Sequence, residues 1–192
     1  MEIKGIHLLL TYQCNFRCDH CFVWGRPEAR GVMTVSDIAG ILREAGRIGT
    51  IERVYFEGGE PFLYYPTMLR GIREARGMGF DVGVVTNAYW ATSREDALEW
   101  LGPMVDAGLS DLSISDDDFH SAPGDGKPAN AREAAAELSL PAGSIVTEDP
   151  RERDRGEKKG GSVMFRGRAV EKLTEGMPKK SWTGFTECRR EK

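Results

Sequence analysis

The stretch Cys14-Asn15-Phe16-Arg17-Cys18-Asp19-His20-Cys21 holds three of the four cysteines of this 192-residue chain, in the spacing C-x3-C-x2-C. It follows residues 3–11, whose apolar run Ile6-His7-Leu8-Leu9-Leu10 lacks strict alternation, as in a strand buried on both faces of a parallel sheet. Three thiolates from one short loop can hold a metal ion or a cluster and leave one coordination position open. The spacing alone leaves the kind of metal undecided.

The composition indicates one globular domain, with 40% hydrophobic and 29% charged residues. A formal net charge of −4 gives no basic signature, which argues against a nucleic-acid binder and for a small-molecule or protein partner. We find no secretory signal and no run of the about 20 apolar residues that a membrane span needs. We therefore expect a cytoplasmic protein without a membrane partner, whose cysteines stay reduced; a Cys18–Cys21 disulfide is the alternative.

Strand and helix patterns alternate along the chain. Thr34 is expected to cap the first helix, Thr92 or Ser93 the third and Asn130 the fourth. The expected strands are 3–11, 54–56, 82–87, 111–115, 143–147 and 162–166, and the expected helices are 35–48, one that includes 68–75, 94–105, 130–138 and a short one in 167–173.

This alternation predicts right-handed βαβ crossovers and a parallel sheet. The chain offers five to six βα units in 192 residues, whereas a closed eight-fold barrel has eight units in about 250 residues. The expected fold is therefore α/β, an open, partial TIM-like barrel.

The loops that follow parallel strands converge on one rim, which is the usual place of an active site. Polar and metal-binding residues follow each of the first four expected strands: the cysteines, then Gly58-Gly59-Glu60-Pro61, then Thr86-Asn87, then Asp116-Asp117-Asp118-Phe119-His120. In the fourth strand, Ser113 and Ser115 lie on the face opposite Leu112 and Ile114. Both hydroxyls would point into the lumen if the apolar face meets the helices.

The cysteine spacing resembles the cluster-binding signature of the radical S-adenosylmethionine (radical SAM) enzymes. The resemblance implies that Cys14, Cys18 and Cys21 hold a [4Fe–4S] cluster, with S-adenosylmethionine on the fourth iron through its amino and carboxylate groups. An electron-transfer ferredoxin would instead need a fourth cysteine nearby. Phe16 and His20 are expected beside the cofactor; His20 stands where the family often has an aromatic hydrocarbon.

Gly58-Gly59-Glu60-Pro61 resembles the glycine-rich motif of the same family, whose backbone and acid meet the ammonium group of S-adenosylmethionine. Two glycines allow a tight turn close to a ligand, and Glu60 offers an acceptor for a cation. The alternative is an ordinary strand-to-helix turn.

The resemblance also places polar groups of the third and fourth strands on the ribose or carboxylate, and the fifth strand on the adenine. The candidates are Thr86, Asn87, Ser113, Ser115 and Ile145. The alternative for the serines is hydrogen bonding to neighbouring backbone. Asp116 and His120 are expected to contact the substrate; the acids of this loop could instead bind a divalent ion or close a solvated turn.

The resemblance implies a reaction in which the reduced cluster passes one electron to S-adenosylmethionine, whose homolysis gives methionine and a 5′-deoxyadenosyl radical that abstracts hydrogen from a substrate. It also implies an external electron donor such as a flavodoxin or ferredoxin. A peptide or peptide-derived substrate is the first expectation, by analogy of fold, and an activating or small-metabolite role is the alternative. From another class, the chain could be a non-catalytic iron–sulfur protein or a structural zinc-binding scaffold, with His20 or Cys188 as fourth ligand.

We expect a radical SAM core in residues 1–147, a charged flexible loop in 148–161 and a C-terminal segment in 162–192 that begins a truncated extension. The loop EDPRERDRGEKKGG has no apolar side chain to bury. Cys188 is expected to be a free or buried thiol, and a ligand of an auxiliary cluster is the alternative.

Overall fold

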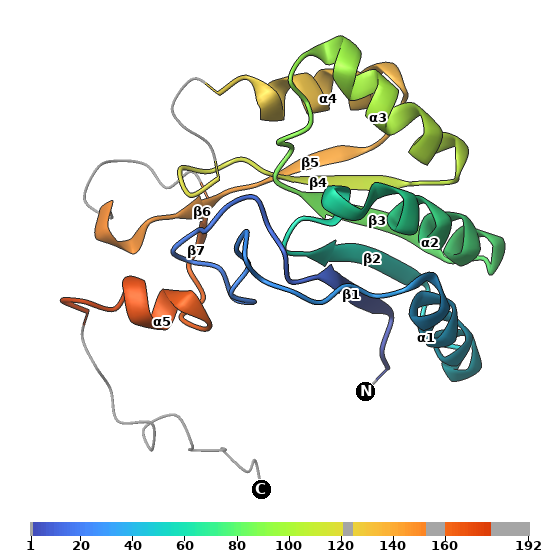
Figure 1. The fold of residues 1–192 in the computed structure, drawn as a ribbon, viewed down its shortest axis with the longest axis horizontal. Helices are drawn as coiled ribbons and strands as arrows, with labels where there is room; N and C mark the ends of the chain where they lie inside the picture. Colours follow the sequence, from blue (N-terminus) through green and yellow to red (C-terminus); the bar gives the residue numbers. More distant parts are fainter. Residues whose placement is uncertain (1, 121–124, 153–159, 178–192) are drawn as a thin grey trace, which may run out of the picture.

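A computed structural model of the chain describes residues 2–120, 125–152 and 160–177. Its centre is a parallel sheet with the strand order β1-β2-β3-β4-β5 (Figure 1). The strands are β1 (Gly5–Thr11), β2 (Arg53–Gly58), β3 (Asp81–Thr86), β4 (Asp111–Ser115) and β5 (Ala142–Ile145). The connections contain α1 (Val35–Ile48), the short 3-10 helix η1 (Pro61–Tyr64), α2 (Tyr65–Gly77), α3 (Arg94–Asp106) and α4 (Lys127–Glu137). The expected α/β partial barrel is confirmed.

The register of the strands gives the sheet two different faces. Leu8 pairs with Phe56, and Phe56 with Val84, and these side chains are buried in the same core as the inner residues of the helices. Burying one such side chain contributes about 1.5–3 kcal/mol relative to leaving it exposed. His7 and Tyr55 pair on the other face. The first face therefore holds the core, and the second is left for a site.

Capping residues set the ends of two helices as predicted. The Thr34 hydroxyl accepts a hydrogen bond from Asp37 N, and Ser93 does the same for Asp96 N at the start of α3. The prediction that Asn130 caps the fourth helix is wrong, because α4 already begins at Lys127, where Pro128 fits the first turn. Asn130 instead donates from Nδ2 to the Ala91 carbonyl, 3.0 Å away, and ties α4 to the segment after β3.

The chain after β5 departs from the prediction. Residues Thr147–Glu148 (β6) and Gly161–Ser162 (β7) pair in parallel as a separate two-stranded sheet, so the expected sixth strand at 162–166 is wrong and the main sheet has five. A side chain at Gly160 would lie 2.4 Å from the Val146 carbonyl oxygen, so only glycine allows this approach. The expected loop 148–161 is thus paired at both ends, with a short turn η2 (Pro150–Glu152), and its residues 153–159 lie outside the described part.

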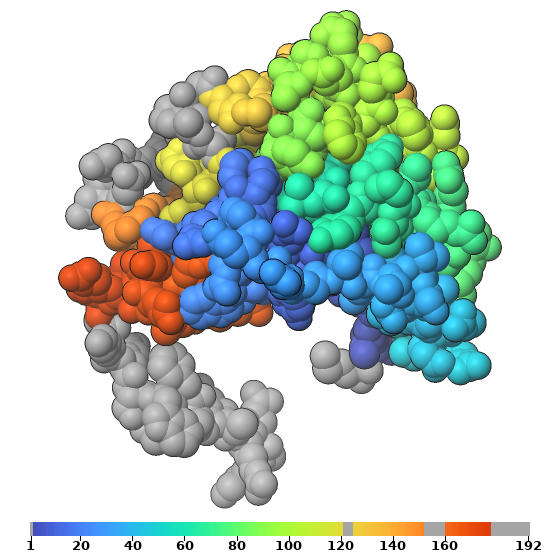
Figure 2. Space-filling model, in the orientation of Figure 1, coloured from blue at the N-terminus to red at the C-terminus, as the bar shows by residue number. Residues whose placement is uncertain are grey.

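The short helix α5 (Arg168–Lys172) packs near the N-terminal loop that carries the cysteines. Val163, Ala169 and Leu173 form a small core of their own, with Phe119 against it. Figure 2 shows this red-orange segment against the blue surface of the N-terminal loop. Cys188 lies outside the described residues. Within the described part, no helix has the length and apolar character needed to cross a membrane.

Candidate active site

A cavity of about 670 Å³ lies at the C-terminal ends of the strands, where the cysteine loop, the glycine turn and the second face of the sheet meet. Its volume is in the range of small-molecule sites. The predicted site residues that line it are Cys14, Phe16, Cys18, His20, Cys21, Gly58, Gly59, Thr86, Asn87, Ser113, Ser115, His120 and Ile145. Glu60, Pro61 and Asp116 are not part of its wall.

The three cysteines of the loop are free thiols that line one end of the cavity. Cys14 Sγ receives a hydrogen bond from Phe16 N at 3.4 Å, and Cys21 Sγ receives one from Gly25 N at 3.2 Å. The Asn87 amide nitrogen lies 3.7 Å from Cys14 Sγ and joins the end of β3 to this loop. N–H groups directed at sulfur stabilise a thiolate and tune a cluster that the thiolate holds.

Burial raises the pKa of the Cys14 thiol to about 11 and that of Cys18 to about 12. The neighbouring Cys14 and Cys21 raise the pKa of Cys18 further. Thiols of this kind are protonated at neutral pH and are poor nucleophiles, so they do not suit a cysteine-based covalent mechanism. They become thiolates when a bound cationic centre displaces their protons.

The backbone of the loop closes tightly around these thiols. Cys14 N donates to the Arg26 carbonyl at 3.1 Å, which brings the two ends of the loop together. A side chain at Gly25 would lie 3.3 Å from Cys14 Cβ and 3.5 Å from Cys21 Sγ. This set of three thiols on one cavity wall, with N–H groups aimed at two of them, fits the [4Fe–4S] cluster that the family resemblance implies.

Arg168, at the start of α5 near the C-terminal end of the described residues, holds the same loop through hydrogen bonds. We call these contacts the Arg168 brace. Its guanidinium donates from Nη1 to the Cys18 carbonyl and from Nη2 to the Gly25 carbonyl, both at 2.7 Å, and its backbone N donates to the Cys21 carbonyl. Arg168 is only 5% exposed. The contact of Arg168 with the cysteine loop was not predicted from the sequence, because its partners lie up to 150 residues away in the chain. The only local sign of a special backbone at this point was the preceding Gly167.

The glycine turn joins the end of β2 to the cysteine loop. Gly58 has a φ of 140°, and a side chain there would lie 2.3 Å from the Thr11 carbonyl oxygen. A side chain at Gly59 would lie 2.1 Å from the Gln13 carbonyl oxygen. Both glycines are therefore required by close backbone packing, and both still line the cavity.

Glu60 does not face the cavity as a free acceptor, which corrects the expectation that its carboxylate meets a cation. Its Oε1 accepts hydrogen bonds from Thr86 Oγ1 and Phe62 N, and its Oε2 accepts one from Asn87 N. The side chain is fully buried, and burial raises its pKa to about 7 against the lowering effect of these bonds. Glu60 thus positions Thr86 and Asn87, which do line the cavity, and Pro61 begins η1 behind them.

Asp116 also differs from the expectation. Its carboxylate pairs with Arg132 of α4 and does not line the cavity. Asp117 is buried, with Oδ1 2.7 Å from His120 Nδ1, and it does not line the cavity either. Burial acts to raise the pKa of Asp117, but the hydrogen bond from His120 and other favourable contacts hold it below its usual range.

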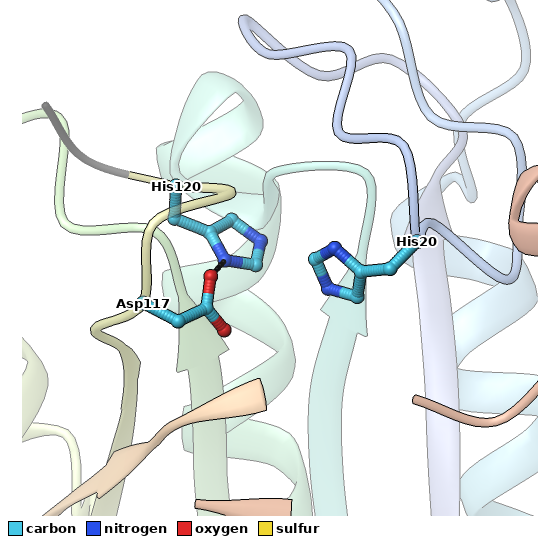
Figure 3. A group of neighbouring side chains, drawn as sticks. All are labelled: His20, Asp117 and His120. Carbon is cyan, nitrogen blue, oxygen red and sulfur yellow. Dashed lines mark hydrogen bonds and ion pairs between the residues drawn. The ribbon is translucent and has the colours of Figure 1, made fainter. Parts of the chain in front are cut away.

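His20 of the cysteine loop lies opposite this pair (Figure 3). The rings of His20 and His120 meet edge to face, with centroids 4.9 Å apart, and Phe119 packs on His20 at 4.4 Å. Burial, followed by the nearby His120, lowers the pKa of His20. The cysteine loop and the loop after β4 are thus in direct contact at this point.

Known proteins share both the sequence pattern and the fold. The sequence model of the Radical SAM superfamily matches residues 8–139. The chain belongs to the radical SAM superfamily. Membership implies a [4Fe–4S] cluster and S-adenosylmethionine as cofactors, and the cavity offers donors for both. Arg168 lies outside the segment matched to the superfamily.

Several curated radical SAM relatives are similar to this chain over part of their length. YydG of Bacillus subtilis (strain 168), named for peptide biosynthesis, is 26% identical over 63% of this chain and 38% of its own. A protein of Methanocella arvoryzae named as a GTP 3′,8-cyclase is 30% identical over 59% of this chain and 34% of its own. A Pyrococcus furiosus protein, named as modifying the cofactor of a tungsten-containing aldehyde ferredoxin oxidoreductase, is 29% identical over 60% and 31%. The chain spans about a third of the length of these relatives.

Among solved structures, methylornithine synthase (PylB) matches with a TM-score of 0.59 and 12% identity, over 92% of this chain and 50% of that one. At this identity the match concerns the radical SAM fold alone.

Proposed function

We propose that this chain binds a [4Fe–4S] cluster through Cys14, Cys18 and Cys21 and reductively cleaves S-adenosylmethionine, so that a 5′-deoxyadenosyl radical takes hydrogen from a substrate. The observation that carries the proposal is that three free thiols line one end of a cavity whose other walls are the glycine turn and the polar strand ends. When bound, the two cofactors together supply the one-electron chemistry. An external electron donor such as a flavodoxin or ferredoxin is part of the proposal.

The residues of the chain would bind and orient the cofactors. Gly58 and Gly59 line the cavity, and we assign their backbone groups to the methionine part. Asn87, held by Glu60 at its backbone and by Asn15 at its side chain, fixes the end of β3 against the cysteine loop.

The other residues of the cavity wall offer two kinds of group to the adenosine part of S-adenosylmethionine. Ser113 and Ser115 present hydroxyls on the second face of β4, suited to the ribose or carboxylate. Phe16, His20 and Ile145 present rings and an apolar side chain, suited to the adenine. Each of these side chains lines the cavity, and each assignment is part of the proposal.

A peptide or peptide-derived substrate is the finer part of the proposal. Its support is the similarity to YydG, a protein named for peptide biosynthesis. His120 lines the cavity and is proposed to contact this substrate, whereas Asp116 pairs with Arg132 and is not part of this proposal.

The test is anaerobic reconstitution with iron and sulfide, followed by addition of dithionite and S-adenosylmethionine and measurement of 5′-deoxyadenosine. We expect a brown protein that forms the nucleoside. Cys14→Ala, Cys18→Ala and Cys21→Ala should each lose the cluster absorbance. Cys188→Ala, at a position outside the described residues, is the matched control and should keep it. Failure to load the cluster, or no nucleoside from a well-loaded protein, would refute the proposal.

A further inference from the structure

His20, Asp117 and His120 form a cluster of metal-binding side chains beside the cysteines. One ligand atom from each of the three lies within 4.8 Å of the others. His20 comes from the cysteine loop and the other two from the loop after β4, so the group joins two walls of the cavity (Figure 3). The function proposed above uses His20 through its ring and His120 for substrate, and it leaves their nitrogen lone pairs without a joint role.

A second observation points to a ligand-binding role for His20. The Nδ1 atom of His20 is buried and has no hydrogen-bond partner in the part of the chain that is described. Buried polar atoms are nearly always paired, and an unpaired one needs an explanation such as an ion or water. An imidazole nitrogen with a free lone pair is the commonest protein ligand of first-row metal ions.

The other two side chains are held in place by the surrounding backbone. Asp117 Oδ1 accepts hydrogen bonds from Phe119 N at 3.1 Å and from His120 Nδ1, and its Oδ2 accepts one from Thr147 N at 3.0 Å. The Asp117 side chain is 1% exposed and that of His120 is 16% exposed. Ligand carboxylates are usually oriented by hydrogen bonds such as those from Phe119 N and Thr147 N, and an ion bound by Asp117 Oδ1 and His120 Nδ1 would displace the proton that these two atoms share.

We propose that His20, Asp117 and His120 bind one divalent first-row metal ion, separate from the cluster, whose open positions face the cavity and take an oxygen ligand such as a substrate carboxylate. Two imidazoles and one carboxylate are a known ligand set for such ions. Two donors at about 2.1 Å from one ion are at most about 4.2 Å apart. The widest pair, at no more than 4.8 Å, must therefore close by at most roughly 0.6 Å, which side-chain rotation supplies.

This site is compatible with a cofactor contact at His20. A stacked adenine uses the face of the imidazole ring, whereas a metal ion is bound by a nitrogen lone pair in the plane of the ring. The ion would draw the loop after β4 towards the cysteine loop and fix a substrate next to the cofactor.

The probe is Mn²⁺, because imidazole and carboxylate suit it and the neighbouring thiols do not. The cluster-loaded protein, without dithionite or S-adenosylmethionine, is titrated with Mn²⁺ while the electron paramagnetic resonance signal of the free ion is followed. We expect one bound Mn²⁺ per chain. His20→Phe and His120→Phe keep an aromatic ring but remove the nitrogens, and each should weaken binding at least tenfold.

His7→Phe is the matched control. His7 lines the same cavity, stacks on Tyr55 and pairs through Nδ1 with Glu57, but lies outside the three-residue group. Its replacement should leave Mn²⁺ binding unchanged. Iron content and cluster absorbance are measured for each variant, and His120→Phe, outside the cysteine loop, decides the question if His20→Phe fails to load.

The proposal is overturned if the wild-type protein binds no stoichiometric Mn²⁺, or if His120→Phe binds it as tightly as wild type. An equal loss in His7→Phe would also overturn it. The titration involves no turnover, so its outcome is independent of whether 5′-deoxyadenosine is formed.

Discussion

Glu60 places a carboxyl group where water does not reach it. Its folded-state pKa of about 7 lies above the ordinary value of 4.5, so between these pH values the folded chain keeps a proton that the unfolded chain has released. The contribution of this site to the free energy of unfolding is therefore fully present below pH 4.5 and is lost as the pH rises through 7.

Glu60→Gln should remove this pH dependence. The stability advantage of the wild-type chain over the variant should shrink by up to about 3 kcal/mol between pH 5 and pH 8. Urea unfolding of both cluster-free proteins across this range measures the difference. Parallel pH profiles would show that Glu60 does not titrate in this way.

Gly59 is limited by its neighbour and not by its own dihedral angles. An added methyl group would lie 2.1 Å from the Gln13 carbonyl oxygen, so Gly59→Ala must push β2 away from the cysteine loop. We expect a loss of about 2–4 kcal/mol in unfolding free energy and a lower iron content after reconstitution. Gly143→Ala, where nothing lies within 4 Å, is the control and should change stability by less than about 0.5 kcal/mol. Equal stabilities of the two variants would contradict the packing described here.

The sequence allowed most residues of the cavity wall to be predicted, because strand ends and motif spacing place them on one rim. The period of two in β4 puts Ser113 and Ser115 on the cavity side. The inward burial of Glu60 could not be predicted in this way. It depends on donors from Thr86 and Asn87, which only the packed sheet brings within reach.

At the scale of elements, α5 acts on the cysteine loop through one buried cation. Each hydrogen bond from Arg168 to a carbonyl oxygen involves a charged donor, worth about 1.5–3 kcal/mol. The cation also lies near thiols that become anionic when they bind iron, as its lowering effect on the pKa of Cys18 indicates.

Arg168→Met should therefore shorten the lifetime of the cluster in the presence of a chelator and shift its reduction potential to a more negative value. Arg168→Lys keeps the positive charge but cannot donate to both carbonyl groups at once. Its cluster should therefore have a reduction potential close to that of the wild type but a shorter lifetime in the presence of the chelator. Arg47→Met removes the same charge from an exposed side chain of α1, away from the cavity, and is the control. If Arg168→Met and Arg47→Met behave alike, the hydrogen bonds of Arg168 have no specific effect on the cluster.

Helices and strands that are marked in the sequence by a capping residue or a side-chain period were predicted well. Those that depend on backbone contacts alone were not. The limits of α1 follow from the Thr34 cap and from Gly49, which adopts a φ of 74° after its last turn. The paired strands β6 and β7 have only two residues each and depend on a backbone contact between Gly160 and Val146. No side-chain pattern in the sequence could therefore predict them. The first helical turn of α4 is likewise set by Pro128, which outweighed the capping signal of Asn130.

At the scale of the molecule, cluster loading should stabilise two segments at once, the cysteine loop and the segment of α5. The cysteine loop and the segment of α5 share hydrogen bonds, whereas the core strands are already buried in the free protein. Hydrogen exchange should slow on loading in residues 14–26 and in residues 161–173, and change little in β2 to β4. A response limited to residues 14–26 would show that the two segments are not coupled.

The order of the sheet explains why its architecture could be predicted. Each strand pairs with the one before it in the sequence, so repeated right-handed crossovers lead to a single arrangement.

The contact between Arg168 and Cys18 spans 150 residues, and this separation has a consequence for synthesis. At about 5–20 residues per second, the ribosome makes the cysteines roughly 8–30 s before the arginine that braces them. During this interval, the strands can pair in the order in which they emerge, while the cysteine loop still lacks its brace. Iron and sulfur delivered during this interval would meet a loop that its own Cys14–Arg26 hydrogen bond can close but that the Arg168 guanidinium does not yet hold.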